Sequence, residues 1–284
     1  MSPTELSVDQ QEQSAKLRTI LHAQTRLLDG LIHHLVQPET KAESADVLQI
    51  APLMLQALGI SVHSTLKLCV GRDMAIRDAY GIARSASELA VNIAYIAVGG
   101  SEVAKRADRH AMQKTYRDMM RRGEIGGLEF TISRDHIPRA EEVPGLTEAL
   151  AEFTGRKGQE LTDWTSASIS DRIKEVRCVS ETAGTYLAGA VTSIYRHSSE
   201  LLHGTYFGVI HFWRGSDAVA TSREAFDEKW EEHFLSIFNG LFFSVGAVIT
   251  LYAQMFKLPE IGAAQRQLVS ATQEWVEQHG SRQP

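Results

Sequence analysis

Residues 234–256 read FLSIFNGLFFSVGAVITLYAQMF, a run of 23 positions without a charged side chain. A run of this length can cross a bilayer, but the central helix of a bundle, buried on all sides, has the same composition. Polar residues are spread along the run, at Ser236, Asn239, Ser244, Thr250 and Gln254. Because these residues weaken insertion, and because we find no second span and no clear Lys or Arg flank, the sequence favours a buried helix over a membrane span.

Helical spacing continues along the rest of the sequence, with apolar residues recurring three and four positions apart. Pro52 suits the start of a helix, and Gly99 and Gly100 interrupt one. No run of alternating polar and apolar residues predicts a β-strand. The sequence therefore predicts an all-α multi-helix bundle, with helices at about residues 8–36, 52–70, 73–98, 101–122, 146–157, 162–177, 180–203, 222–256 and 262–279.

The predicted helices group into three parts of the chain. We expect an N-terminal amphipathic helix within residues 1–45, a main helical domain over residues 46–260, and a C-terminal helix and tail over residues 261–284. Within the main domain, residues 123–160 contain several glycines, prolines and charges. This composition predicts an irregular connection with short helices, and a connection of this length is often functional.

Composition and charge narrow the class of protein. Of 284 residues, 43% are hydrophobic, which is enough for a sizeable core. The net charge of −6 argues against a general, charge-driven nucleic-acid binder. The sequence has only two cysteines, and its N-terminus lacks the basic start and apolar run of a secretory signal, so we expect a cytoplasmic protein. The glycine-rich loops of nucleotide-binding folds and the nucleophile elbow of α/β hydrolases are missing.

A first polar stripe lies in the predicted helix at residues 73–98. Tyr80, Arg84, Glu88 and Asn92 are each four positions apart, so they share one helix face. Their neighbours are small or apolar, which is not typical of a solvated face. One interpretation is a surface ion pair between Arg84 and Glu88. The other is a partly buried polar site that faces another helix.

A second polar group lies near the end of the predicted helix at residues 180–203. Tyr195, Ser199 and His203 are four apart, and Arg196 and His203 are seven apart, so two turns bring the last two to nearly one face. An arginine supplies fixed charge and paired donors for a phosphate, and a histidine moves a proton near neutral pH. Together they can cleave RNA without a metal. The alternative is a histidine stabilised by the C-terminal helix dipole, with Gly204 directly after the helix.

The sequence gives little support for a metal site. Glu200 and His203 have the spacing of half of a di-iron motif, but no second Glu-x2-His follows. The other histidines lack the spacing of zinc ligands. We therefore expect neither a metal nor another cofactor.

Both polar groups resemble the motifs of a bacterial all-helical family of unknown function. That family has an Arg-x3-Glu helix and a Tyr-x2-Leu-Ser-x3-His helix. The matching stretches here are RSASELAVNIAY at residues 84–95 and YRHSSELLHGT at residues 195–205, with Ser198 in place of the usual leucine.

The run from Arg196 to His203 is also similar to the Arg-x4–6-His motif of the HEPN superfamily, with His197 in the place of its usual polar residue. Many HEPN proteins are metal-independent ribonucleases of toxin–antitoxin, abortive-infection and CRISPR systems, and they commonly form dimers. The resemblance implies a HEPN-like core with extra N- and C-terminal helices, and Arg196 and His203 as the catalytic pair. It also implies RNA as the substrate, a homodimer, and an antitoxin or regulatory protein as a further partner.

Two hypotheses remain open at this stage. In the first, the protein is a HEPN-like ribonuclease in stress response or phage defence, and the catalytic pair is supported by Arg84, Glu88, Tyr195, His197, Ser199 and Glu200. In the second, it is a non-enzymatic helical binding or regulatory module. Its Arg, Glu, Tyr, Ser and His side chains then form a buried polar network that fixes helix register.

Overall fold

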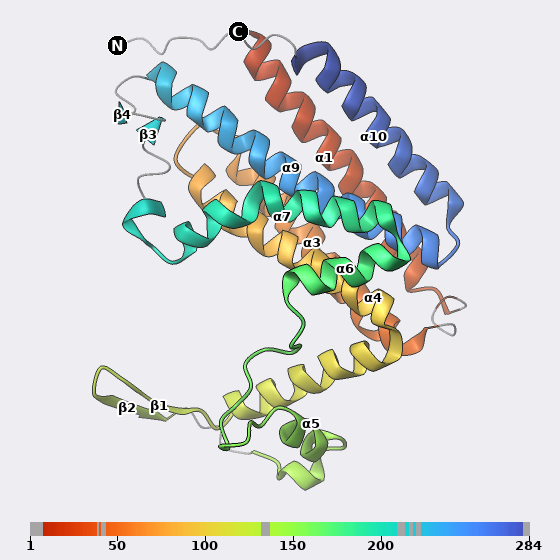
Figure 1. The fold of residues 1–284 in the computed structure, drawn as a ribbon, viewed down its shortest axis with the longest axis vertical. Coiled ribbons are helices and arrows are strands. Elements are labelled where there is room, and N and C mark those ends of the chain that lie inside the picture. The colour runs from red at the N-terminus through yellow and green to blue at the C-terminus, as the bar shows by residue number, and fades with distance from the viewer. Residues whose placement is uncertain are drawn as a thin grey trace.

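The computed structural model describes residues 8–38, 40, 44–131, 137–208, 214–215, 218–219 and 223–280. The described chain is predominantly helical, which confirms the all-α multi-helix bundle (Figure 1). Its long helices are α1 (Val8–Leu35), α3 (Ala45–Leu68), α4 (Ile76–Asp118), α7 (Glu181–Leu202), α9 (Arg223–Met255) and α10 (Pro259–Gly280). The shorter elements are β1 (Arg122–Ile125), β2 (Leu128–Thr131), the 3₁₀ helix η1 (Ala140–Glu142), α5 (Leu146–Glu152), α6 (Ile169–Val179), β3 (Arg214–Gly215) and β4 (Ala218–Val219).

Helix α9 forms the centre of the bundle and contains the uncharged run. It packs against α1 and α10 on one side and against α4 and α7 on the other. Most of its large side chains are almost completely buried, among them Phe234, Leu241, Val248 and Tyr252. Burial of each such side chain contributes roughly 1.5–3 kcal/mol. Burial of most side chains in residues 234–256 explains why this run lacks charges, whereas the part of α9 before the run contains several.

Two of the described helices are long and apolar enough to cross a membrane by length and composition. They are α3 and the Lys229–Met255 part of α9. The expectation of a single such run is therefore wrong, since α3 also qualifies. Most of the apolar window in α9 is buried inside the bundle, whereas most of that in α3 is not.

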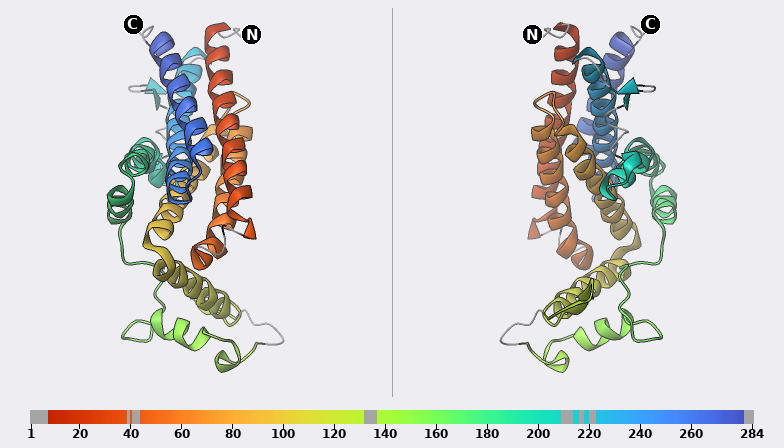
Figure 2. Two further views of the ribbon diagram at one scale, coloured as in Figure 1. Left: turned by 90° about the vertical axis from the view of Figure 1, so that its right-hand side faces the viewer. Right: turned by 90° about the vertical axis from the view of Figure 1, so that its left-hand side faces the viewer.

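Helix α4 bends sharply at Gly100, where the backbone has φ 63° and ψ −148°. This positive φ is a conformation that glycine adopts readily and other residues rarely adopt. Residues before the bend pack in the bundle, and residues after it lead into a projecting arm with α5 and the β1–β2 hairpin (Figure 2). The break predicted at Gly99 and Gly100 is thus a kink between two packed segments.

The arm contains a feature that the sequence did not predict. Residues 122–131 form an antiparallel hairpin, with Gly126 and Gly127 at its turn and φ values of 59° and 83°. Two successive positive φ values are typical of the tight turn that joins paired strands. The strands are four residues long and mostly exposed, so they lack the apolar alternation that marks a half-buried strand.

Three helix boundaries also differ from the prediction. Helix α3 begins at Ala45, so Pro52 lies inside it, because the buried side chains of Val47, Leu48 and Ala51 extend the apolar face toward the N-terminus. Helix α5 ends at Glu152 and not at 157. Helix α6 begins only at Ile169, where the Ser168 hydroxyl accepts a hydrogen bond from the backbone N–H of Asp171 and caps the helix.

Candidate functional site

The polar stripe of α4 faces the C-terminal half of α7. The two helices run side by side in opposite directions, so that Gly81 lies against Leu202 and Arg84 lies against Tyr195. A Cβ atom at Gly81 would be 3.1 Å from Cδ2 of Leu202, so glycine lets the two helices approach closely. The structure therefore brings Tyr195, one member of the second polar group, against the α4 stripe.

Arg84, Glu88 and Tyr195 form the centre of this contact. The Arg84 guanidinium carbon lies 4.5 Å from the centroid of the Tyr195 ring. The Tyr195 hydroxyl donates a long hydrogen bond of 3.5 Å to Oε1 of Glu88. All three residues are half-buried. A cation over an aromatic face is attracted to the ring, so this stacking holds the guanidinium between the helices.

Arg84 has no anionic partner among the described residues. No described carboxylate lies within ion-pair distance of its guanidinium, and its buried Nε atom has no hydrogen-bond partner. The surface ion pair with Glu88 that the spacing allows is therefore not formed. The positive charge of Arg84 is partly withdrawn from water, without a compensating negative charge among the side chains that the structure describes.

The two ends of the α4 stripe differ in their surroundings. Nη1 of Arg172, on α6, donates a hydrogen bond to Oδ1 of Asn92, which links a third helix to the stripe. Tyr80 is buried, and its ring meets His233 of α9 edge to face at 5.4 Å. Burial also raises the pKa of the Tyr80 hydroxyl. The sequence holds no signal for the contact between Asn92 and Arg172, because 80 positions separate them.

The predicted proton-transfer residue lies directly beyond α7. His203 is exposed, and Gly204 follows it with φ 63°, as expected for the residue that ends a helix. Glu200 is half-buried, and its Oε2 accepts a 2.9 Å hydrogen bond from the Thr205 hydroxyl. Leu202 contacts Gly81, three residues before Arg84 on α4, whereas Tyr195, over which the Arg84 guanidinium lies, comes eight positions before His203, about 12 Å along the axis of α7.

Three other predicted site residues lie within α7, but their side chains fall outside the described part of the structure. These are Arg196, His197 and Ser199. Position 196 follows Tyr195 by one residue, so it is rotated by about 100° from Tyr195 around the axis of α7. Among the described residues, no group of three or more His, Cys, Asp or Glu side chains is placed to hold a metal ion.

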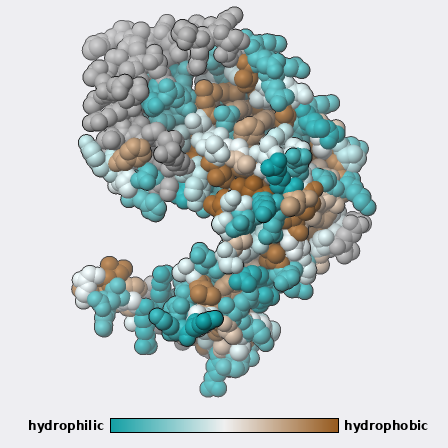
Figure 3. Space-filling view, viewed as in Figure 1, coloured by the Kyte–Doolittle hydropathy of each residue, from teal (hydrophilic) through white to brown (hydrophobic). Residues whose placement is uncertain are grey.

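The surroundings of the site are concave. In the space-filling view the molecule is hollowed between the bundle and the projecting arm (Figure 3). The C-terminal end of α7 and the β1–β2 hairpin project on this side of the molecule. Exposed aromatic side chains, Tyr206 and Phe207, follow the end of α7.

The comparisons with known proteins cover this part of the chain. A model described as "Family of unknown function (DUF5677)" matches residues 64–219, which is more than half of the sequence. The match contains both halves of the site, from Arg84 to Asn92 and from Tyr195 to His203. No curated protein and no solved structure shows significant similarity to the chain. The chain therefore belongs to this family of unknown function, DUF5677.

Proposed function

We propose that the protein is a HEPN-like, metal-independent ribonuclease whose site lies where α4 meets the C-terminal end of α7. The observation that carries the proposal is the guanidinium of Arg84, stacked on Tyr195 without an anionic partner among the described residues. A charge withdrawn from water is costly unless it is paired. An RNA phosphate supplies the missing negative charge and accepts two parallel hydrogen bonds from arginine.

His203 is the proton-transfer group of this proposal. Its exposure at the end of α7 leaves the imidazole accessible to a large substrate. In the reaction, the ribose 2′ oxygen attacks the neighbouring phosphorus and the bond to the 5′ oxygen breaks. The hydroxyl loses a proton and the leaving oxygen gains one, and His203 carries out one of these transfers. Arg84 and Arg196 stabilise the charge on the phosphate.

The proposal also covers the oligomeric state, the cellular location and the regulation of the enzyme. By the similarity of Arg196–His203 to the HEPN motif, we propose a homodimer that acts on RNA in the bacterial cytoplasm, in stress response or phage defence. An antitoxin or another regulatory protein controls it in this scheme. The hollow between bundle and arm offers RNA a concave surface beside the end of α7 (Figure 3).

The alternative function is a non-enzymatic binding or regulatory module. The hydrogen bond between Arg172 and Asn92 favours it, because this bond ties α6 to α4. Against it, Arg84, Glu88 and Tyr195 are half-buried and not buried, and the hydrogen bond between Tyr195 and Glu88 is long. A network that fixes helix register needs fully satisfied partners, which Arg84 lacks among the described residues.

The two functions differ in what removal of His203 does. We would incubate the full-length protein with labelled tRNA and total RNA in EDTA, and compare the wild type with His203→Ala and the matched control His63→Ala, an exposed histidine on α3. The proposal predicts cleavage by the wild type and by His63→Ala, and a rate lower by about 100-fold or more for His203→Ala. Both variants keep the melting temperature, since an exposed side chain contributes within about 0.5 kcal/mol.

Two results would contradict the proposal. One is wild-type cleavage by a folded His203→Ala variant. The other is an absence of cleavage by the wild type together with a clearly lowered melting temperature of His203→Ala, which would assign this side chain to a structural network.

A further inference from the structure

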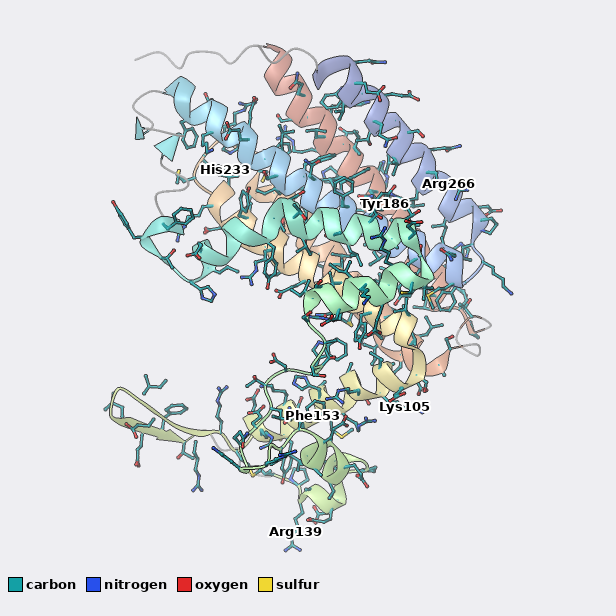
Figure 4. All side chains as sticks on the ribbon, in the orientation of Figure 1. Lys105, Arg139, Phe153, Tyr186, His233 and Arg266 are labelled. Carbon is teal, nitrogen blue, oxygen red and sulfur yellow. The ribbon has the colours of Figure 1, made fainter. Side chains whose placement is uncertain are left out.

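Two aromatic side chains are exposed directly beyond α7. Tyr206 is 75% exposed and Phe207 is 54% exposed, and they are the two exposed aromatic residues of the part of the chain that the structure describes. The other described phenylalanine, tyrosine and tryptophan side chains are buried or half-buried. Figure 4 shows one of them, Phe153, in the arm, where its ring lies 4.9 Å from that of His110. Exposure is therefore particular to Tyr206 and Phe207, which with the exposed Leu202 form an apolar patch at the end of α7.

A capped turn holds the two aromatic residues at the end of α7. Residues 206–208 are helical, and the Thr205 hydroxyl accepts a 3.1 Å hydrogen bond from the backbone N–H of Gly208, as the capping residue of a helix does. The same hydroxyl donates a 2.9 Å hydrogen bond to Oε2 of Glu200, within α7. The turn is thus tied to the last residues of α7, and the backbone that carries the exposed rings is held in place.

The rings lie close to the group that transfers the proton in the proposed reaction. Tyr206 follows His203 by three residues, and three residues of chain span at most about 10 Å. Successive positions of a helical turn point about 100° apart, so Tyr206 and Phe207 offer two separate ring faces. The parts of a substrate next to the reacting phosphate therefore lie beside these rings.

Exposed planar rings suit the bases of a nucleic acid. Every base has a flat face that stacks on an aromatic ring, so stacking tolerates any base. Bases in a duplex are already stacked and paired, whereas those of single strands and loops are free to stack on protein side chains. Aromatic residues are also common in protein interfaces, but the place of this pair beside His203 favours RNA over another protein.

We propose that Tyr206 and Phe207 stack on unpaired bases next to the cleaved bond, and so select single-stranded RNA and RNA loops over duplex RNA. This inference rests on the proposed function, since it adds base contacts to the same site. His203 transfers a proton in that reaction, whereas the two rings bind bases and take no part in the transfer. Loss of a ring therefore weakens the binding of RNA and leaves the chemistry of the cleaved bond unchanged.

The test measures binding without cleavage. The full-length protein is titrated with a short fluorescent single-stranded RNA whose 2′ oxygens are methylated, so that the ribose cannot attack the phosphate, and with the same strand in a duplex. We expect the single strand to bind at least about tenfold more tightly than the duplex. Tyr206→Ala and Phe207→Ala are each expected to weaken binding of the single strand by about fivefold or more, as the loss of one stacked base does.

Three further variants distinguish the planar ring from its apolar surface. Tyr206→Phe keeps the ring and is expected to bind like the wild type, whereas Tyr206→Leu keeps an apolar side chain and is expected to bind as weakly as Tyr206→Ala. Leu53→Ala, at a 69% exposed leucine on α3, is the matched control and keeps the wild-type affinity. Because all these positions are exposed, the variants keep the melting temperature of the wild type.

The inference is overturned if the single strand does not bind at about 100 μM protein, or if the duplex binds as tightly. Wild-type affinity of either alanine variant or of Tyr206→Leu overturns it as well. A dimer that dissociates in the alanine variants, with RNA binding unchanged, would assign the rings to a contact with a second copy of the chain. Cleavage is measured separately, with unmodified RNA below saturation. Ring-dependent binding without cleavage would contradict the ribonuclease proposal alone, and wild-type cleavage rates in both alanine variants would contradict the present inference alone.

Discussion

Among single residues, Arg84 and Tyr195 form the central contact of the proposed site. The guanidinium of Arg84 stacks on the Tyr195 ring at 4.5 Å, whereas the Tyr195 hydroxyl reaches Glu88 only across 3.5 Å. The ring therefore contributes more to this contact than the hydroxyl does. A half-buried aromatic ring stabilises through the apolar surface it removes from water and through its attraction for the cation.

Two substitutions at Tyr195 distinguish the contribution of the ring to stability from that of the hydroxyl. We expect Tyr195→Phe to lower the free energy of unfolding by about 0.5 kcal/mol or less, and Tyr195→Ala to lower it by about 1–2 kcal/mol. Urea denaturation of both variants measures the difference. Equal losses for the two would show that the hydroxyl and not the ring stabilises the interface.

At the scale of elements, the kink in α4 decides where the arm begins. Gly100 has a positive φ of 63°, while Gly30 occupies an exposed position of the regular helix α1, with open space around its Cβ position. A glycine in a helix costs stability relative to alanine, but a glycine at positive φ avoids strain that alanine would suffer. The two positions are thus a matched pair with opposite expectations.

Alanine at the two glycines tests the kink. Gly30→Ala is expected to raise the free energy of unfolding by roughly 0.5–1 kcal/mol, and Gly100→Ala to lower it by about 1–2 kcal/mol. Chemical denaturation at neutral pH measures both changes in the free energy of unfolding. If Gly100→Ala stabilised the protein as Gly30→Ala does, α4 would be straight at this residue.

At the scale of the whole molecule, the arm is held by polar contacts more than by a core of its own. Lys114 forms a 2.8 Å ion pair with Glu160, which lowers the pKa of that carboxyl. Burial against Phe153 lowers the pKa of His110 from its ordinary value of 6.5. The bundle, in contrast, is stabilised by the apolar contacts of α9.

Both pKa shifts make the arm less stable in acid. A group with a lowered pKa in the folded state binds protons more weakly there than in the unfolded chain. The free energy of unfolding therefore decreases as the pH decreases. For His110 the loss begins as the pH drops through its ordinary value of 6.5, and for Glu160 it follows below 4.5. We expect hydrogen exchange, corrected for its intrinsic pH dependence, to lose protection in residues 101–118 and 146–164 before α9. Equal loss in α9 would contradict this assignment.

How far the sequence predicted the structure depends on burial. The long helices were predictable because each buries one continuous apolar face, and the centre of the bundle was predictable because residues 234–256 lack charges. The hairpin was not, since its strands are short and exposed. The polar stripe of α4 was visible as spacing, but its contact with Tyr195 depends on how α4 and α7 pack. A cavity lined by Lys257 and Arg266 lies where α7, α9 and α10 meet, and spacing along one helix does not reveal it.

The chemistry of the RNA ends after cleavage shows whether the ribose hydroxyl is the nucleophile. Wild-type protein and Arg84→Ala would be incubated with a labelled RNA in EDTA, and the products identified by mass spectrometry. The account predicts 2′,3′-cyclic phosphate and 5′-hydroxyl ends, because the ribose hydroxyl is the nucleophile, and a rate lower by about tenfold or more for Arg84→Ala. Products with 3′-hydroxyl and 5′-phosphate ends, or the same rate in the variant, would contradict it.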